Sequence, residues 1–224
     1  MGFSELFHFL QRLQQNNSKE WMDAHRKEYQ AARSFFISWL DSLNARLAQM
    51  DPEYFDTPGK KGINRINNNL MFAPHKPVYK DHFAAGLDQR TKQGDFYVEI
   101  GLKNCLLAGG YWRPEPKVLA SIRNAIDYNG EELVAILEKP SFKKMFGSLC
   151  EDASLKTAPK GFSQEHMHID LLRLKTFGVE CRLLPKGHAD LRKEGSLSNF
   201  TAYIEEVYLE MLPFRRYLRE AATV

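Results

Sequence analysis

The middle of this chain carries the pattern that most limits its fold, a set of short stretches whose side chains alternate between apolar and polar. Residues 95–102 alternate over their whole length, and residues 83–87 and 105–112 also fit strands. A further stretch with this alternation occurs later, at 176–184. Strands that follow one another through short turns predict an antiparallel meander, here of about four or more strands.

Helical periodicity lies before and after the meander rather than between its strands. The expected helices cover residues 4–15, 17–50, 116–129, 131–138, 141–146, 163–174 and the stretch from 196 or 198 onward. We expect Ser4, Asn17 and Ser163 to cap their helices, the long helix at 17–50 to bend, and Pro213 to kink or break the last one. This order predicts an α+β fold, with the sheet packed against long N-terminal and C-terminal helices.

The chain is long enough for one large core, since 43% of its 224 residues are hydrophobic. No linker separates two balanced halves, so we expect a single domain over residues 1–224. Cys105, Cys150 and Cys181 are odd in number and widely spaced, which argues against a disulfide framework and a zinc ribbon. No signal pattern opens the sequence, and no apolar run approaches the roughly 20 residues of a membrane helix. We therefore expect a cytoplasmic protein without a membrane partner.

Positive charge gathers in residues 60–82. The formal net charge of the whole chain is +3, which is too small to argue for nucleic-acid binding by itself. Residues 60–82 hold five Lys and Arg residues against one Asp, so the rest of the chain is about neutral. A local basic excess indicates a surface that faces an anion. The alternative is a solvated loop with ordinary lysines.

Turn formers and helix breakers dominate residues 51–82. Apolar residues within this stretch would anchor it in the core, so we expect an ordered, irregular segment rather than a linker. The expected anchors are Ile63, Ile66, Leu70, Met71 and Phe72. Long ordered loops of this kind often carry function.

Side chains that could bind an anion recur near the end of this segment. In an extended chain, Lys76, Lys80 and His82 point the same way. Two ammonium groups and an imidazole that converge would bind a carboxylate or a phosphate, and the Tyr79 hydroxyl could donate from the other side. Arg113 follows the third expected strand and could reach the same end of the sheet. The alternative is a set of exposed side chains that never meet.

Other chemistry has less support from the sequence. Acid–base catalysis by His82 with a carboxylate such as Glu99 is chemically possible, although their spacing does not support it. His166 and Asp170 would share one face of a helix, but two ligands do not make a metal site. We therefore predict no metal and no cofactor, and we assign no catalytic residue.

Six pieces of the sequence, in this order and spacing, carry a family resemblance. They are residues 16–21, 65–72, 76–80, 109–115, 159–162 and 170–175. Through them the chain resembles, over nearly its whole length, the bacterial and fungal family catalogued as domain of unknown function 2461. The resemblance implies a shared fold and a common site, with Trp112 and Lys175 as further candidates for that site, and it implies no activity.

The chain departs from the family pattern in two places. Relatives typically read Arg-Asp-x-Arg-Phe-Ser where residues 68–73 read Asn-Asn-Leu-Met-Phe-Ala, and Asp-Lys-Thr-Pro-Tyr-Lys where residues 75–80 read His-Lys-Pro-Val-Tyr-Lys. If the lost groups perform chemistry, this member has lost or altered it. If they form an internal ion pair, neutral residues can replace it structurally. The residues that keep the pattern are Lys76, Tyr79, Lys80, Arg113 and Lys175.

These residues together predict a pocket for a small ligand or substrate that bears an anionic group, built from residues 63–82 and 109–115. They do not decide whether the protein is an enzyme or what its oligomeric state is. One alternative is a protein-interaction module, in which Tyr111, Trp112 and the basic segment form the binding surface. Nucleic-acid binding ranks below it because the net charge is small. The candidate ligand-binding residues are Arg65, Asn67, Lys76, Tyr79, Lys80, His82, Trp112, Arg113 and Lys175.

Overall fold

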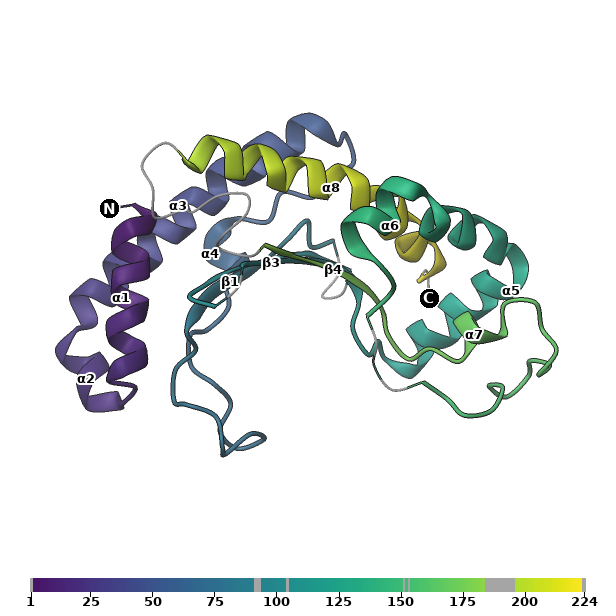
Figure 1. Ribbon diagram of the computed structural model, residues 1–224, viewed down its shortest axis with the longest axis horizontal. Coiled ribbons are helices and arrows are strands. Elements are labelled where there is room, and N and C mark those ends of the chain that lie inside the picture. The colour runs from purple at the N-terminus through teal and green to yellow at the C-terminus, as the bar shows by residue number, and fades with distance from the viewer. Residues whose placement is uncertain are drawn as a thin grey trace. The chain divides into compact units, whose positions relative to one another are not determined.

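The computed structural model describes residues 2–90, 94–103, 105–150, 152, 154–183 and 196–222. Its helices are α1 (Phe3–Gln15), α2 (Lys19–Ala24), α3 (Arg26–Met50), α4 (Gly59–Gly62), α5 (Pro116–Glu138), α6 (Pro140–Phe146), α7 (Ile169–Leu172) and α8 (Ser196–Ala221). Its strands are β1 (His82–Leu87), β2 (Phe96–Gly101), β3 (Cys105–Tyr111) and β4 (Phe177–Leu183). The strands form an antiparallel sheet in the order β1-β2-β3-β4 (Figure 1). This arrangement confirms the predicted α+β fold.

The chain divides into two compact units. Unit 1 comprises Met1–Gln89, Tyr97–Leu107 and Arg182–Glu205, and unit 2 comprises Arg90–Phe96, Ala108–Cys181 and Glu206–Val224. Each unit has a core of its own. The expectation of a single domain stays a prediction.

Aromatic side chains build the core of unit 1. The Phe83 ring of β1 lies 5.5 Å from the Phe36 ring of α3 and 6.5 Å from the Phe9 ring of α1. Phe3 of α1 meets Trp39 of α3 edge-on at 5.2 Å, and such pairs add to the stability that burial gives. Because the apolar residues of α1 and α3 recur at helical spacing, both helices present them to β1 and share one core with it.

The long helix expected over residues 17–50 is divided at His25. Its backbone there is not helical, with φ −109° and ψ 23°, so α2 ends and α3 begins at this residue. The His25 ring stacks on Trp21 with 4.0 Å between ring centres, and its Nδ1 lies 2.8 Å from the Trp21 carbonyl oxygen. Ser18, not Asn17, caps α2, because the Trp21 N–H donates to Ser18 Oγ at 3.2 Å. The Ser18 hydroxyl thus satisfies an N–H at the start of α2 that would otherwise lack a partner. The Trp21 carbonyl also accepts from the His25 N–H at 3.0 Å.

Other predicted helix ends are wrong. Ser4 lies inside α1, where Gly2 precedes the first turn and its N–H donates to Glu5 Oε2 at 2.7 Å. The helix expected over residues 163–174 is reduced to α7, because Ser163 Oγ accepts from the Glu165 N–H in a local turn instead of starting a helix. Pro213 does not end α8, which continues to Ala221.

Unit 2 packs α5, α6 and the second half of α8 around its own aromatic side chains. Phe142 of α6 lies 5.8 Å from Phe214, and Phe96 meets Tyr208 edge-on at 5.2 Å, measured between ring centres. Asn129 interrupts α5 at the position where a helix end was predicted. Strand β4 was predicted to reach Leu184, which lies outside the described residues.

Candidate functional site

Residues 63–85 of unit 1 fold back on themselves, and we call this segment the 63–85 hairpin. The Asn64 N–H donates to the Ala84 carbonyl at 2.8 Å, and the Lys80 N–H donates to the Ile66 carbonyl at 2.8 Å. Asn67 also pairs with Tyr79 in an antiparallel bridge. Figure 1 shows the two arms running out together from β1. The predicted ordered segment therefore has a backbone ladder of its own.

The apex of the hairpin differs from its base. Ile66 is 4% exposed and Tyr79 is 5% exposed, so both are buried as anchors of the base. Met71 and Phe72 are 79% and 80% exposed, and the expectation that they are buried anchors is wrong. They lie in the turn closed by the bond from the Ala73 N–H to the Asn69 carbonyl, where no core is in reach.

Asn17 fixes the hairpin to the junction between α1 and α2. Its side-chain Nδ2 donates to the Tyr79 carbonyl at 2.9 Å, and its Oδ1 accepts from the Tyr79 N–H at 2.8 Å. One amide side chain thus satisfies both backbone groups of a residue 62 positions away. This pairing brings residues 16–21 beside residues 76–80, two of the pieces that carry the family resemblance.

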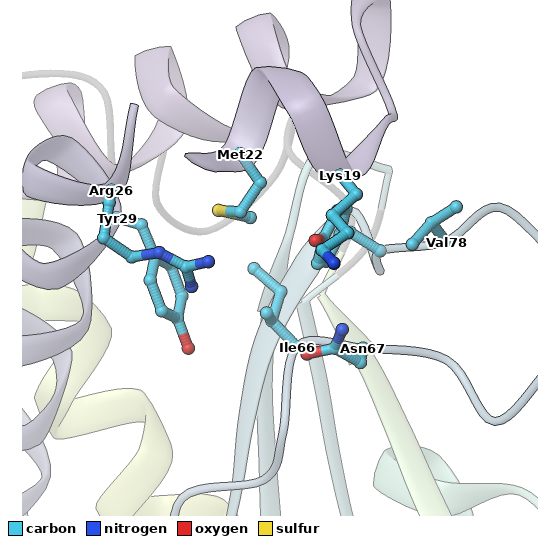
Figure 2. A pocket seen from close by; sticks show the side chains of 8 residues that line it. Lys19, Met22, Arg26, Tyr29, Ile66, Asn67 and Val78 are labelled. Atoms are coloured by element: carbon cyan, nitrogen blue, oxygen red, sulfur yellow. The ribbon is translucent and has the colours of Figure 1, made fainter. Parts of the chain in front are cut away.

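A pocket of about 290 Å³ opens where this junction faces the hairpin. Figure 2 shows Arg26 and Tyr29 on one side of the pocket, Met22 above it, and Ile66 and Asn67 below it. The α2–α3 region thus forms one wall and the base of the hairpin forms the other. The lining residues are Lys19, Met22, Arg26, Tyr29, Ile66, Asn67, Val78 and Tyr79.

The charge of the pocket comes from Lys19 and Arg26. Among the described residues, Lys19 has no hydrogen-bond or ion-pair partner, whereas Arg26 contacts Asp23 one turn earlier on the chain. Burial raises the pKa of Tyr79, and the nearby Asp23 carboxylate raises it further. Tyr79 therefore keeps its hydroxyl proton around neutral pH. The lining offers hydrogen-bond donors together with positive charge, which suits an anionic group.

Lys80 and His82 are not among the residues that line the pocket, whereas Tyr79 is. His82 Nδ1 lies 3.2 Å from Asp81 Oδ1, and His82 Nε2 lies 3.4 Å from Glu99 Oε2 of β2. The Tyr97 hydroxyl donates to the same Glu99 oxygen at 2.8 Å. Antiparallel pairing of β1 with β2 thus joins His82 and Glu99, whose separation in sequence gave no support for such a pair.

Lys80 makes its own contact outside the pocket. Its Nζ donates to the Arg65 carbonyl at 2.8 Å. Burial lowers the pKa of Lys80, Glu99 raises it, and Lys76 lowers it. The Arg65 and Lys76 side chains are exposed.

The remaining predicted site residues lie in unit 2. Arg113 Nε and Nη2 donate to the two carboxylate oxygens of Asp152 at 2.8 and 2.7 Å. The Thr176 hydroxyl donates to the same carboxylate at 2.8 Å, so Arg113 is part of a structural ion pair. Trp112 is 62% exposed, and Lys175 is half-buried.

The histidines near α7 do not form the pair that was considered for a metal. His166 Nε2 lies 3.0 Å from Asp127 Oδ1 of α5, because the helix that would align His166 with Asp170 is not formed. Within the described parts of the chain, no three or more His, Cys, Asp or Glu side chains are grouped to hold a metal ion. Likewise, none of the described helices is both long and apolar enough to cross a membrane.

The model of a family described as "Conserved hypothetical protein (DUF2461)" matches residues 5–217. The chain belongs to this family. The match covers the 63–85 hairpin, the pocket and His82, and it confirms the resemblance seen in the sequence. No curated protein and no solved structure matches the chain significantly.

Sequence reasoning missed several residues of this region. Asn17 was assigned to a helix cap, and Lys19 and Arg26 were not considered because they belong to a helical pattern far from the basic segment. The signal that could have found Asn17 and Lys19 is their place in the first piece of the family resemblance, residues 16–21. Arg26 lies outside every piece of the family resemblance, so the sequence offered no signal for it.

Proposed function

We propose that the pocket of unit 1 binds a small ligand that carries an anionic group. The observation that carries this proposal is the Lys19 ammonium, which has no partner among the described residues and lines the same cavity as Arg26. Asn67 and the Tyr79 hydroxyl would orient the ligand through hydrogen bonds. The earlier expectation that residues 109–115 form part of the wall is not retained, since Arg113 already gives its forked donors to Asp152.

The size and lining of the pocket limit the ligand. A volume of about 290 Å³ lies at the lower end of the range for ligand pockets, roughly 300–1,000 Å³. Met22, Ile66 and Val78 contribute apolar surface, while the cations contribute charge. These features favour a small carboxylate or phosphate with a short apolar body.

A thermal-shift screen of small carboxylates and phosphates tests this function. We expect a ligand that stabilises the protein and that binds Lys19→Ala and Arg26→Ala at least about tenfold more weakly, because a charge-assisted hydrogen bond contributes roughly 1.5–3 kcal/mol. Lys27→Ala is the matched control, since Lys27 is an exposed cation of α3 that does not line the pocket. A ligand that stabilises all three variants as well as wild type would place the site elsewhere.

A second candidate function, protein interaction, is favoured by the apex of the hairpin. Met71 and Phe72 are adjacent and largely exposed, and no acidic residue occurs between Gly59 and Lys80. A partner surface with an apolar slot and an acidic rim would complement them. Tyr111 is not part of such a surface, because it is 5% exposed.

Photo-crosslinking in cells tests the second candidate. A crosslinking amino acid at position 72 should give one discrete product that disappears with Lys76→Glu. The same amino acid at position 128, where Tyr128 is 91% exposed in unit 2, should give none. A product from both positions, or one that survives Lys76→Glu, contradicts the interaction.

The cellular setting that fits either function is the cytoplasm. Cys105, Cys150 and Cys181 are all free thiols, as is usual in a reducing compartment. Cell fractionation of the tagged protein tests this location.

A further inference from the structure

We propose that the outer edge of the 63–85 hairpin, formed by residues 65–69, binds an extended acidic segment of a partner protein as an added strand. This inference rests on the second candidate function, protein interaction, and names the kind of partner. It is independent of the pocket, whose ligand is a small molecule.

The backbone direction of Asn67 is the first support. Asn67 and Tyr79 lie opposite each other in an antiparallel bridge. The hydrogen bonds of the ladder are made by their neighbours, Ile66 with Lys80 at 2.8 Å and Asn68 with Val78 at 2.9 Å. In an antiparallel pair, the backbone groups of residues between such bonds point away from the opposite arm. The N–H and C=O of Asn67 therefore lie on the outer edge of its arm.

The two edges of the hairpin differ in how their backbone groups are satisfied. The Tyr79 N–H and carbonyl, on one edge, are both bonded to the Asn17 side chain. Among the described residues, the N–H and C=O of Asn67 on the other edge have no such partner. Asn67 is exposed, and no described strand pairs with its outer edge. A free edge of this kind is where an extended peptide can add as a strand.

The residues beside Asn67 extend this edge. The same alternation puts the N–H groups of Arg65 and Asn69 on it. The Arg65 carbonyl already accepts from Lys80 Nζ at 2.8 Å, and the Asn69 carbonyl accepts from the Ala73 N–H at 3.1 Å. The edge thus offers donors at positions 65, 67 and 69 and an acceptor at position 67. An extended segment of about five residues can meet these groups.

Charge determines which kind of segment fits. Arg65 lies on the edge itself, and Lys60, Lys61 and Lys76 are further exposed cations of the same part of the chain. No acidic residue occurs between Gly59 and Lys80, so an acidic segment meets complementary charge and a basic one is repelled. The same positive charge disfavours pairing of this edge with that of a second copy.

An amide NMR titration of the full chain tests the added strand. The probe is a capped peptide of about seven residues in which glutamate and valine alternate, followed at the amides of Arg65 and Asn69. We expect Asn67→Pro to bind it at least about fivefold more weakly, because the outward N–H is lost. The inner ladder does not use this N–H, and proline is tolerated at an outer edge. Asn67→Ala is the matched control, since it keeps the N–H and removes the side chain that lines the pocket.

Two changes in the peptide test the same contact without altering the protein. Lysine in place of glutamate should abolish binding, since the charges then repel. Methyl groups on the backbone nitrogens of the central residues should also abolish it, because they keep the charge and remove the donors to the Asn67 carbonyl. These peptides decide the question even if Asn67→Pro does not fold.

The outcomes separate this edge from the apex and from the pocket. The proposal is overturned if the glutamate peptide perturbs neither amide, if the methylated peptide binds as tightly, or if Asn67→Ala weakens binding as much as Asn67→Pro. It is also overturned if Lys19→Ala does so, because the peptide then occupies the pocket. A crosslink from position 72 with no response at Arg65 and Asn69 would place the partner on the apex alone. A response at these amides without a crosslink would support the edge and contradict the apex.

Discussion

The two hydrogen bonds between the Asn17 side chain and the backbone of Tyr79 should stabilise unit 1 measurably. Asn17→Ala removes both hydrogen bonds, of 2.9 and 2.8 Å, and leaves the Tyr79 N–H and carbonyl without these partners beside a buried side chain. Each such bond has a net value of about 1 kcal/mol. We therefore expect the free energy of unfolding to fall by about 2 kcal/mol.

Urea denaturation measures this loss, and amide hydrogen exchange locates it. The Tyr79 amide should lose protection in Asn17→Ala. The Lys80 amide should change less, because it donates to the Ile66 carbonyl and not to Asn17. Asn17→Asp should lie between Asn17→Ala and wild type, since it keeps the acceptor for the Tyr79 N–H and loses the donor to the Tyr79 carbonyl.

The neighbouring Asn16 provides the matched control. Its exposed side chain makes a local bond to the Arg12 carbonyl at 3.0 Å, so Asn16→Ala should cost less than about 0.5 kcal/mol. The reasoning is refuted if Asn17→Ala and Asn16→Ala are equally stable, or if the Tyr79 amide exchanges at the wild-type rate in Asn17→Ala.

Three further predictions concern other parts of the chain. Burial raises the pKa of Tyr217 to about 12, so the folded protein keeps a proton that the unfolded chain releases near pH 10. The free energy of unfolding should thus fall as pH rises from about 10 to about 12, and Tyr217→Phe should lack this part of the fall in pH-dependent denaturation. Asp152→Asn should lower the free energy of unfolding in calorimetry, because it weakens the acceptor shared by Arg113 and Thr176. An unchanged melting temperature would count against that ion pair. A Cβ at Gly62 would lie 2.5 Å from the Gly86 carbonyl oxygen, whereas one at Gly147, where φ is +73°, meets nothing within 4 Å. Gly62→Ala should therefore cost about 2 kcal/mol or more and Gly147→Ala about 1 kcal/mol in urea denaturation, and the reverse order would contradict the close approach of α4 to β1.

The fold could be predicted from the sequence because its strands and long helices have clear periods. Strand β2 was expected at 95–102 and occupies Phe96–Gly101, since alternation is a local property of the chain. The break at His25 had no such signal. It depends on stacking with Trp21 and on a side-chain bond to the Trp21 carbonyl, and neither Gly nor Pro marks the position.

The candidate site could be predicted only where it follows from local geometry. Alternation predicts that Lys76, Lys80 and His82 point one way and Tyr79 the other, and Tyr79 is the one of these four that lines the pocket. The partners of these residues could not be derived in this way. Glu99 comes beside His82 through the register of two strands, and Asn17 meets Tyr79 across 62 residues. Such pairings depend on tertiary packing, which no single segment encodes.

The departures of this chain from the family pattern can now be placed. Residues 69–73 form the exposed turn at the apex of the hairpin, whereas Asn67 and Tyr79 line the pocket at its base. Asn68 lies between them, and its side chain donates to the Pro77 carbonyl at 2.8 Å, which closes the hairpin without an ion pair. The lost charges therefore alter what the apex can contact. The cations of the pocket and the contact between His82 and Glu99 lie elsewhere in unit 1.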